Sequence, residues 1–204
     1  MERKEHWEGV YTTRGERDVS WFEALPVISI EMLDAAGVTR DSCVLDVGGG
    51  DSRLVDHLLE RGLECLAVLD VSGASLRRAR ARLGDRAGVP IWIEADVAGE
   101  WAVKPMDVWH DRAVLHFLTD AADRARYVAR LHEVLKVGGA AIVATFAPDG
   151  PEKCSGLPVV RYSPESLAGT LGAGFRLLES RRHRHLTPAG VPQAFQYSRF
   201  LRVS

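Results

Sequence analysis

The sequence has few cysteines, no long apolar run and little net charge, and each shortage excludes a class of protein. Its three cysteines are isolated among 204 residues, so they indicate neither a disulfide framework nor a zinc knuckle. No apolar run approaches membrane-spanning length, which argues against insertion in a bilayer. The formal net charge of −2 lacks the basic excess of most nucleic-acid-binding proteins. We therefore expect neither a membrane nor a nucleic acid as partner.

The remaining composition is that of an ordinary globular chain. Hydrophobic residues make up 46% and charged residues 26%, and the length suits one domain spanning residues 1–204. The charged start, MERKEHWEGVY, has no apolar core of the signal-peptide type, so the default prediction is a cytoplasmic location. A basic run at residues 181–185 is more typical of the exposed edge of a late strand than of a nucleic-acid patch. Nothing in the composition indicates an oligomeric state.

What the sequence does contain is a glycine-rich turn, VLDVGGGDS, at residues 44–52. The apolar start is typical of a buried parallel strand, and glycines end a strand. Leucine and valine then recur at helical spacing, which predicts a helix from Ser52 to about Arg61. A ligand can lie against a glycine backbone, and the first helical N–H groups point towards it. We therefore expect a ligand at Gly48, Gly49 and Gly50.

Acidic residues follow successive predicted strands and indicate which ligand this is. Asp46, inside the turn, would repel a pyrophosphate but suits an ammonium or sulfonium group. Asp70 ends the strand 65–70, twenty residues after Gly50, where a carboxylate can accept hydrogen bonds from both ribose hydroxyls. Asp96 follows a third strand that begins at Ile91. Asp46 therefore favours a ligand with an ammonium or sulfonium group, and Asp70 favours a ribose.

The pattern Asp-x-Gly-x-Gly resembles the first motif of the class I, Rossmann-like S-adenosylmethionine-dependent methyltransferases. Residues 107–113 are similar to the fourth motif, and Asp111-Arg112-Ala113 resembles the Asp-Arg-Gly of thiopurine methyltransferase-like members. The resemblance covers residues 42–146 and implies S-adenosylmethionine as cofactor, with Asp96 on the adenine amine and the Val97 N–H on a ring nitrogen. It implies a cofactor site made by Asp46, Gly48, Gly49, Gly50, Asp70, Val71, Asp96, Val97 and His116.

The chain departs from the family pattern at three places. Gly49 lies within the glycine turn, and Ser52 stands where a further glycine is frequent. Asp111-Arg112 replaces the Asn-Pro-Pro-Tyr of enzymes that methylate amino groups of nucleic acids. This last departure argues against N-methylation of adenine or cytosine.

Asp111 and Arg112 are the candidate catalytic residues, each with two open roles. Asp111 could orient or deprotonate an acceptor, or hold the cofactor's ammonium group. Arg112 could bind an acidic acceptor or pair with Asp111. Methyl transfer needs positioning and desolvation more than covalent help, so a dedicated base is not required. Residues expected near the acceptor besides Arg112 are Trp21, Phe146 and Cys154.

His116 is open between a place against the cofactor and a structural role. Together with His110 and Asp111 it could be imagined as a metal-ligand set, but the motifs already explain this strand end. The sequence therefore predicts no metal site.

The predicted fold is a three-layer α/β Rossmann-like sheet, mostly parallel, with helices on both faces and a carboxyl-terminal antiparallel hairpin. Residues 1–36 are expected to form a helical lid and residues 42–146 the cofactor-binding core. Residues 147–204 are expected to form a substrate loop, a helix at 163–171 and the hairpin, with strands at 175–185 and 193–203. A helix at 121–135 is expected to end in a glycine C-cap at Gly138-Gly139.

The favoured function is transfer of a methyl group from S-adenosylmethionine to a small-molecule acceptor. Three alternatives stay open at this point. Small methyltransferases of similar layout also act on protein lysines. An NAD-dependent oxidoreductase shares the glycine turn and the ribose acid, but Asp46, and Arg53 in place of the third glycine, weaken that interpretation. A non-catalytic scaffold or sensor would keep the cofactor-binding acids and lack turnover.

Overall fold

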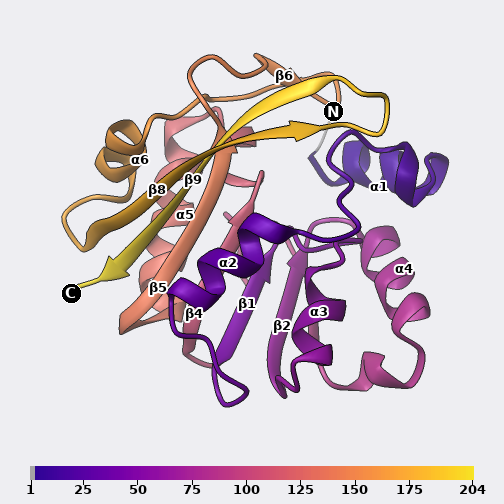
Figure 1. Cartoon of the computed structure of the whole chain (residues 1–204), viewed down its shortest axis with the longest axis horizontal. Coiled ribbons are helices and arrows are strands. Elements are labelled where there is room, and N and C mark those ends of the chain that lie inside the picture. Colours follow the sequence, from indigo (N-terminus) through magenta and orange to yellow (C-terminus); the bar gives the residue numbers. More distant parts are fainter. Residues whose placement is uncertain (1–2) are drawn as a thin grey trace.

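The computed structural model describes residues 3–204, and the first two residues of the predicted lid lie outside them. Figure 1 shows a twisted sheet with helices on both faces. The helices are α1 Arg3–Thr13, α2 Val27–Ala35, α3 Leu54–Glu60, α4 Gly73–Leu83, α5 Ala121–Val134 and α6 Pro164–Leu171, with 3-10 helices η1 Glu16–Asp18, η2 Gly84–Gly88 and η3 Leu115–Phe117. The strands are β1 Cys43–Val47, β2 Cys65–Asp70, β3 Ile91–Glu94, β4 Met106–Arg112, β5 Leu135–Phe146, β6 Lys153–Cys154, β7 Leu157–Pro158, β8 Phe175–Leu186 and β9 Pro192–Arg202.

Seven strands form the main sheet in the order β3-β2-β1-β4-β5-β9-β8. The first five strands are parallel, and β9 runs antiparallel to both of its neighbours, β5 and β8. The predicted α/β Rossmann-like fold with a carboxyl-terminal antiparallel hairpin is therefore confirmed. β1 is an inner strand, and the chain runs from it to β2 on one side and later returns to β4 on the other. The strand order therefore reverses at the carboxyl end of β1, where such sheets bind ligands.

Both faces of the sheet are buried, and alternate residues of each strand belong to different cores. Val44 packs with α2, α3 and α4, whereas Leu45 packs with α5 and α6. In Figure 1, α2 crosses in front of the sheet and α5 lies behind it. A period of two along a strand produces this division. The same alternation determines which polar side chains of β1 and β4 lie on one face of the sheet and can contact each other.

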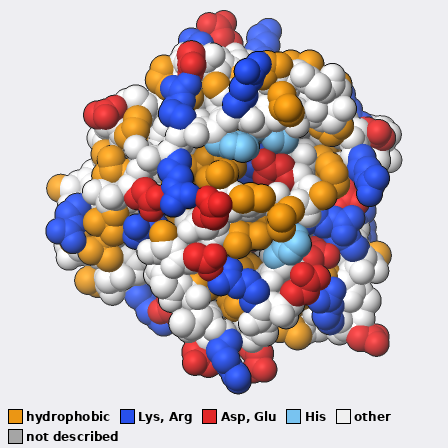
Figure 2. Space-filling view, viewed as in Figure 1, with side chains coloured by type: hydrophobic (Ala, Val, Ile, Leu, Met, Phe, Trp, Pro, Cys, Tyr) orange, Lys and Arg blue, Asp and Glu red, His pale blue; other side chains and the backbone are white. Residues whose placement is uncertain are grey.

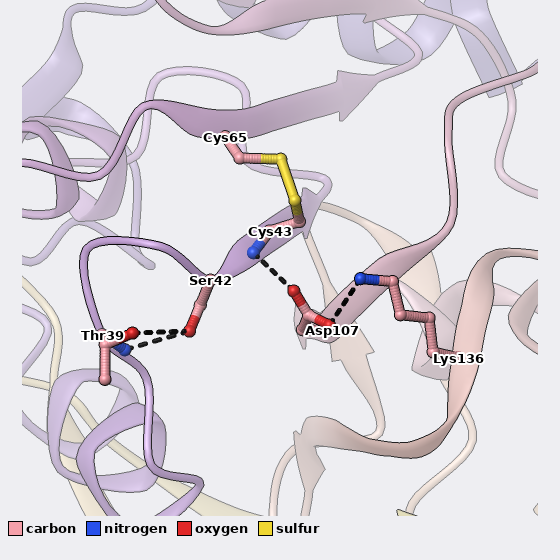
Figure 3. The surroundings of a disulfide bond; sticks show 6 residues. All are labelled: Thr39, Ser42, Cys43, Cys65, Asp107 and Lys136. Atoms are coloured by element: carbon pink, nitrogen blue, oxygen red, sulfur yellow. Dashed lines mark hydrogen bonds and ion pairs between the residues drawn. A yellow bond between two sulfur atoms is a disulfide. The ribbon is translucent and has the colours of Figure 1, made fainter.

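A disulfide joins Cys43 to Cys65, so the expectation of no disulfide was wrong. The two cysteines begin β1 and β2 and face each other in the parallel register, with Cα atoms 4.6 Å apart. Figure 3 shows the neighbouring Asp107, whose carboxylate accepts from the Cys43 amide at 2.8 Å and pairs with Lys136 at 2.7 Å. The sequence did not reveal the pair because only strand register brings the two sulfurs together. The remaining cysteine, Cys154, is buried and free.

The predicted glycine C-cap of α5 was also wrong. The helix ends at Val134, and the next residue begins β5 without a loop, so Gly138 and Gly139 lie within the strand. Gly139 packs so closely on the Asp107 carbonyl that a Cβ there would lie 2.8 Å from its oxygen. Gly139 therefore permits close strand packing, whereas Gly138 adopts φ +83°, a backbone conformation that favours glycine.

The carboxyl-terminal third follows the predicted layout with one difference. α6 is capped by Ser163, and β8 and β9 form the long hairpin. β8 is the sheet edge, as expected for the basic run, and Arg182 pairs with Asp149. His185 is buried, however, because it faces the segment before α2 instead of solvent.

Among residues 3–204 no helix has the length and apolarity needed to cross a membrane. The cytoplasmic location stays a prediction.

Candidate functional site

Two adjoining pockets lie at the carboxyl end of the parallel strands and share Tyr11, Trp21, Gly48 and Arg112. We name them by their linings. The apolar pocket is partly open to solvent and has an empty volume of about 780 Å³, which includes some of that solvent. It is lined by residues that include Trp7, Asp70, Val71, Asp96, Val97, Phe117, Cys154, Gln193 and Phe195. The polar pocket is lined by residues that include Glu23, Ser29, Asp46, Gly49 and His110.

The glycine turn brings backbone to the boundary between these pockets. Gly48 has φ +67° and Gly50 has φ +32°, backbone conformations that side chains rarely adopt. A Cβ on Gly48 would collide with Val114, and one on Gly50 would collide with the Asp70 carboxylate. Glycine is therefore required at both positions, and Gly49 between them lines the polar pocket.

Asp46 presents one carboxylate oxygen without a partner. Its Oδ1 lies 2.7 Å from Nδ1 of His110, which stands opposite it on β4, while its buried Oδ2 has no hydrogen-bond partner among the described residues. The His110 Nε2 lies 2.9 Å from the Ser29 hydroxyl, which fixes the ring at both ends. A buried carboxylate oxygen needs a donor or cation. The polar pocket therefore suits the ammonium group that the sequence predicted beside Asp46.

Asp70 lies at the end of β2 against Gly50, on the apolar pocket. One carboxylate oxygen accepts from the Ser72 amide at 2.8 Å. Burial raises the pKa of Asp70 to about 7, against the lowering effect of the hydrogen bonds from Ser72 and Ser75. Val71 follows it in the lining of the same pocket. The buried Asp70 carboxyl group therefore gains or loses its proton near neutral pH.

Asp96 and Val97 also line the apolar pocket, but Asp96 already has a cationic partner. Its Oδ2 pairs with Arg3, and Arg3 also donates to Asp123 at 2.6 Å. Its Oδ1 accepts from the Ala98 amide at 2.9 Å. Arg3 of α1 therefore stands where the family resemblance implies an adenine contact.

Arg112 lines both pockets and is held by residues distant in sequence. It donates to the Trp21 carbonyl at 2.9 Å and to the Tyr197 hydroxyl at 3.0 Å, and it pairs with Glu23 at 3.0 Å. Its guanidinium carbon lies 5.1 Å from the centre of the Phe195 ring. Of the roles left open by the sequence, a pairing of Arg112 with Asp111 is not present.

Asp111 faces away from both pockets. It lies on the α5 side of the sheet, where its carboxylate accepts from the Tyr127 hydroxyl at 2.7 Å and from the Val114 and Leu115 amides at 2.8 and 3.1 Å. Burial raises the pKa of Asp111 to about 6. These contacts cap η3 and tie β4 to α5. The catalytic role predicted for Asp111 stays a prediction that its position does not support.

His116 and Phe146 are packed together away from the pocket linings. Both are fully buried, and their ring centres are 4.8 Å apart. Burial and the charge of Arg112 lower the pKa of His116 to about 3, so its ring is neutral. By contrast, Trp21 and Cys154 do line the apolar pocket, and burial raises the pKa of the Cys154 thiol to about 11. His110, Asp111 and His116 do not converge, because Asp111 lies on the other face of the sheet from His110.

Sequence reasoning missed several pocket residues. Gln193 and Phe195 line the apolar pocket, and Tyr197 holds Arg112. They occupy alternate positions of β9, so period-two alternation places them on one face, which is a signal that the sequence contains. Glu23 and Arg3 had no comparable local signal, because they reach the site through loops and a separate helix.

Residues 45–141 match a family model described as a methyltransferase domain. Over 117 residues the chain is 33% identical to an uncharacterized methyltransferase of Mycobacterium bovis and to two of Mycobacterium tuberculosis strains. That alignment covers 56% of this chain and 56% of each relative, so the chain spans about half their length.

Solved structures share the fold over nearly the whole chain. The N-methyltransferase NodS of Bradyrhizobium japonicum with S-adenosylhomocysteine has a TM-score of 0.74 at 15% identity, covering 100% of both chains. The 1,6-didemethyltoxoflavin-N1-methyltransferase of Burkholderia thailandensis has a TM-score of 0.70 at 20% identity, covering 98% of this chain and 84% of that one. At such identities the likeness shows the fold alone.

Proposed function

The chain belongs to the class I, Rossmann-like S-adenosylmethionine-dependent methyltransferases, and we propose that it transfers a methyl group from S-adenosylmethionine to a small-molecule acceptor. S-adenosylmethionine is the cofactor of this family. The finer likeness to thiopurine methyltransferase-like members stays a prediction.

The main support for the proposal is the buried Asp46 Oδ2, which has no hydrogen-bond partner among the described residues. It lies beside the glycine turn, and Asp70 contacts the same turn at Gly50. We propose that Asp46 binds the cofactor's ammonium group and that Asp70 accepts from the ribose. Val71, Asp96 and Val97 would then surround the adenine, for which Arg3 must release Asp96. A ligand extending from one pocket to the other would pass Gly48, which lines both.

The bound cofactor supplies an electrophilic methyl group, and the residues of this chain position the acceptor and exclude water. Arg112 is fixed by three protein groups, so it can bind an acceptor with little loss of side-chain entropy. Trp21, Cys154 and Phe195 add an apolar wall around it. Positioning of this kind is the main contribution that a methyl transfer needs from the protein.

A small acceptor is favoured by the shape of the site. Trp7, Tyr11, Trp21 and Phe117 pack against one another over the apolar pocket, with ring centres 5.0 to 6.4 Å apart; the Trp7–Tyr11 pair is tilted and the other three pairs are edge to face. An aromatic cover of this kind suits a compact, partly apolar molecule more than a flexible lysine on a protein surface. Structural relatives include the didemethyltoxoflavin enzyme and a glycopeptide N-methyltransferase.

We further propose that residues 3–36 act as the lid of this site. Glu8 of α1 accepts from the Ser72 hydroxyl at 2.7 Å and the Ala74 amide at 3.1 Å, and so covers the start of α4. Glu16 pairs with Arg53 at the start of α3. Figure 1 shows α1 beside the upper end of α4. The loop, helix and hairpin of residues 147–204 complete the acceptor side.

The acceptor class is tested with labelled cofactor. The purified protein is incubated with methyl-labelled S-adenosylmethionine and a cell extract, and small metabolites are separated from macromolecules. We expect label mainly in the small-molecule fraction for the wild type and none for Asp46→Ala. Label transferred mainly to protein or RNA, and lost with Asp46→Ala, would contradict a small-molecule acceptor while leaving the methyltransferase assignment intact. A parallel binding screen with NAD tests the oxidoreductase alternative.

Cofactor affinity should increase with pH through neutrality. The folded protein holds the Asp70 proton more tightly than the unfolded chain, so Asp70 stabilises the ligand-free fold at low pH and loses this contribution as pH rises through about 7. Ribose hydroxyls donate to the ionised carboxylate, so binding favours deprotonation. We expect the affinity for S-adenosylhomocysteine to rise about tenfold from roughly pH 6 to roughly pH 8, measured by calorimetry. In Asp70→Asn this slope should disappear, and an unchanged slope would contradict the assignment.

A further inference from the structure

Glu23, which also lines the polar pocket, lies beside His183 and His185 of β8, and together they offer three metal-ligating side chains. One ligand atom from each lies within 4.8 Å of the others. The Glu23 Oε1 is 3.1 Å from His185 Nδ1 and 3.9 Å from His183 Nε2. The two histidines share one face of β8 because they are two residues apart. Figure 2 shows histidine side chains beside an acidic one on the face shared by α2 and the β8–β9 hairpin.

Both ring nitrogens of His185 face oxygen atoms that accept hydrogen bonds. Its Nε2 lies 2.7 Å from the Ser20 carbonyl oxygen, which only accepts, so Nε2 carries a proton. In a neutral ring Nδ1 then presents a lone pair, yet it faces the Glu23 carboxylate at 3.1 Å. Two acceptors in contact require a proton or a metal ion between them. Metal-ligating histidines characteristically donate their other N–H to a backbone carbonyl, as His185 does.

The ligand set favours a particular class of metal. Two imidazoles and one carboxylate suit zinc and similar divalent transition metals, whereas calcium and magnesium prefer oxygen ligands alone. Tetrahedral coordination places ligand atoms roughly 3.4 Å apart, given bonds of about 2.1 Å. The Glu23 to His185 distance is close to that value. His183, whose side chain is 32% exposed, lies farther from Glu23 and would have to move closer to it on metal binding.

The proposed site is open to solvent on one side, which leaves space for a further ligand. One other cation of the protein competes for Glu23. A surface hollow lined by residues that include Phe22, Leu25 and Leu186 reaches all three ligands, so water has access. Arg112 pairs with the same Glu23 oxygen at 3.0 Å. A bound metal would therefore compete with Arg112 for Glu23 and leave the guanidinium freer for the pockets.

We propose that Glu23, His183 and His185 form a binding site for a zinc-like divalent metal ion. The site joins the segment before α2, which lines the polar pocket, to strand β8, the neighbour of the pocket-lining strand β9. None of the three residues belongs to the glycine turn or to the acids that follow the strands. Glu23 also pairs with Arg112, so the metal site and the acceptor side of the pockets share this carboxylate.

Titration of the metal-depleted full-length protein tests the site. We expect one equivalent of zinc to bind by calorimetry, and cobalt to give the intense visible absorption of tetrahedral coordination. His183→Ala and Glu23→Gln should each weaken zinc binding at least about tenfold and remove the cobalt spectrum. His132→Ala, on α5 in the opposite layer, is the matched control and should change neither signal. Circular dichroism spectra identical to wild type show that each variant is folded.

Two results would overturn the proposal. One is the absence of stoichiometric zinc binding, which would leave a proton between His185 and Glu23. The other is binding that His183→Ala and Glu23→Gln leave unchanged. Neither result bears on S-adenosylmethionine binding, so the proposed function is tested separately.

Discussion

Asp111→Ala is expected to lower the free energy of unfolding by roughly 3–5 kcal/mol. The carboxylate is fully buried and accepts from the Tyr127 hydroxyl and from the Val114 and Leu115 amides. Alanine would leave all three donors unsatisfied and open a space between β4 and α5. Chemical denaturation monitored by circular dichroism measures the change.

Two variants make this result specific. Asp111→Asn keeps the shape and one acceptor oxygen, so its loss should be smaller than that of alanine. Glu133→Ala removes an exposed carboxylate of α5 that pairs with Arg130, and surface pairs contribute about 0–1 kcal/mol. If Asp111→Ala kept wild-type stability and lost only methyl transfer, the structural role would be refuted and the catalytic one restored.

Asp70→Ala is expected to weaken binding of S-adenosylmethionine and S-adenosylhomocysteine by about 1–3 kcal/mol, the range for hydrogen bonds to a charged group. That range corresponds to roughly a 5-fold to 150-fold rise in Kd. The carboxylate lies against Gly50 and faces the apolar pocket, so its loss removes the proposed ribose acceptor. Calorimetry with both ligands provides the measurement.

Glu64→Ala is the matched control for Asp70→Ala. Glu64 is an exposed carboxylate immediately before β2, at the opposite end of the same strand. Its removal should leave the affinity unchanged. Equal weakening by both variants would point to a general electrostatic effect, and unchanged affinity in Asp70→Ala would remove Asp70 from the cofactor site.

Local patterns were sufficient for the strand and helix layout of the core. The glycine turn, the acids that end β2 and follow β3, and the helix after residue 163 are all where the sequence predicts them. The same alternation could have separated Arg112 from Asp111, because successive residues of β4 point to opposite faces. The sequence analysis placed Asp111 and Arg112 in a single cluster at the end of β4. As a result, it assigned both residues to the same site.

The sequence by itself determined the fold class and the turn at its centre, because hydrophobic period, glycine conformation and capping act over a few neighbouring residues. Only the tertiary structure decided that Cys43 meets Cys65, that Arg3 reaches Asp96, and that Glu23 joins Arg112, His183 and His185. Each of these contacts depends on strand register or on loops crossing the sheet. Such long-range geometry follows from the packing of the whole chain and leaves no trace in local residue spacing.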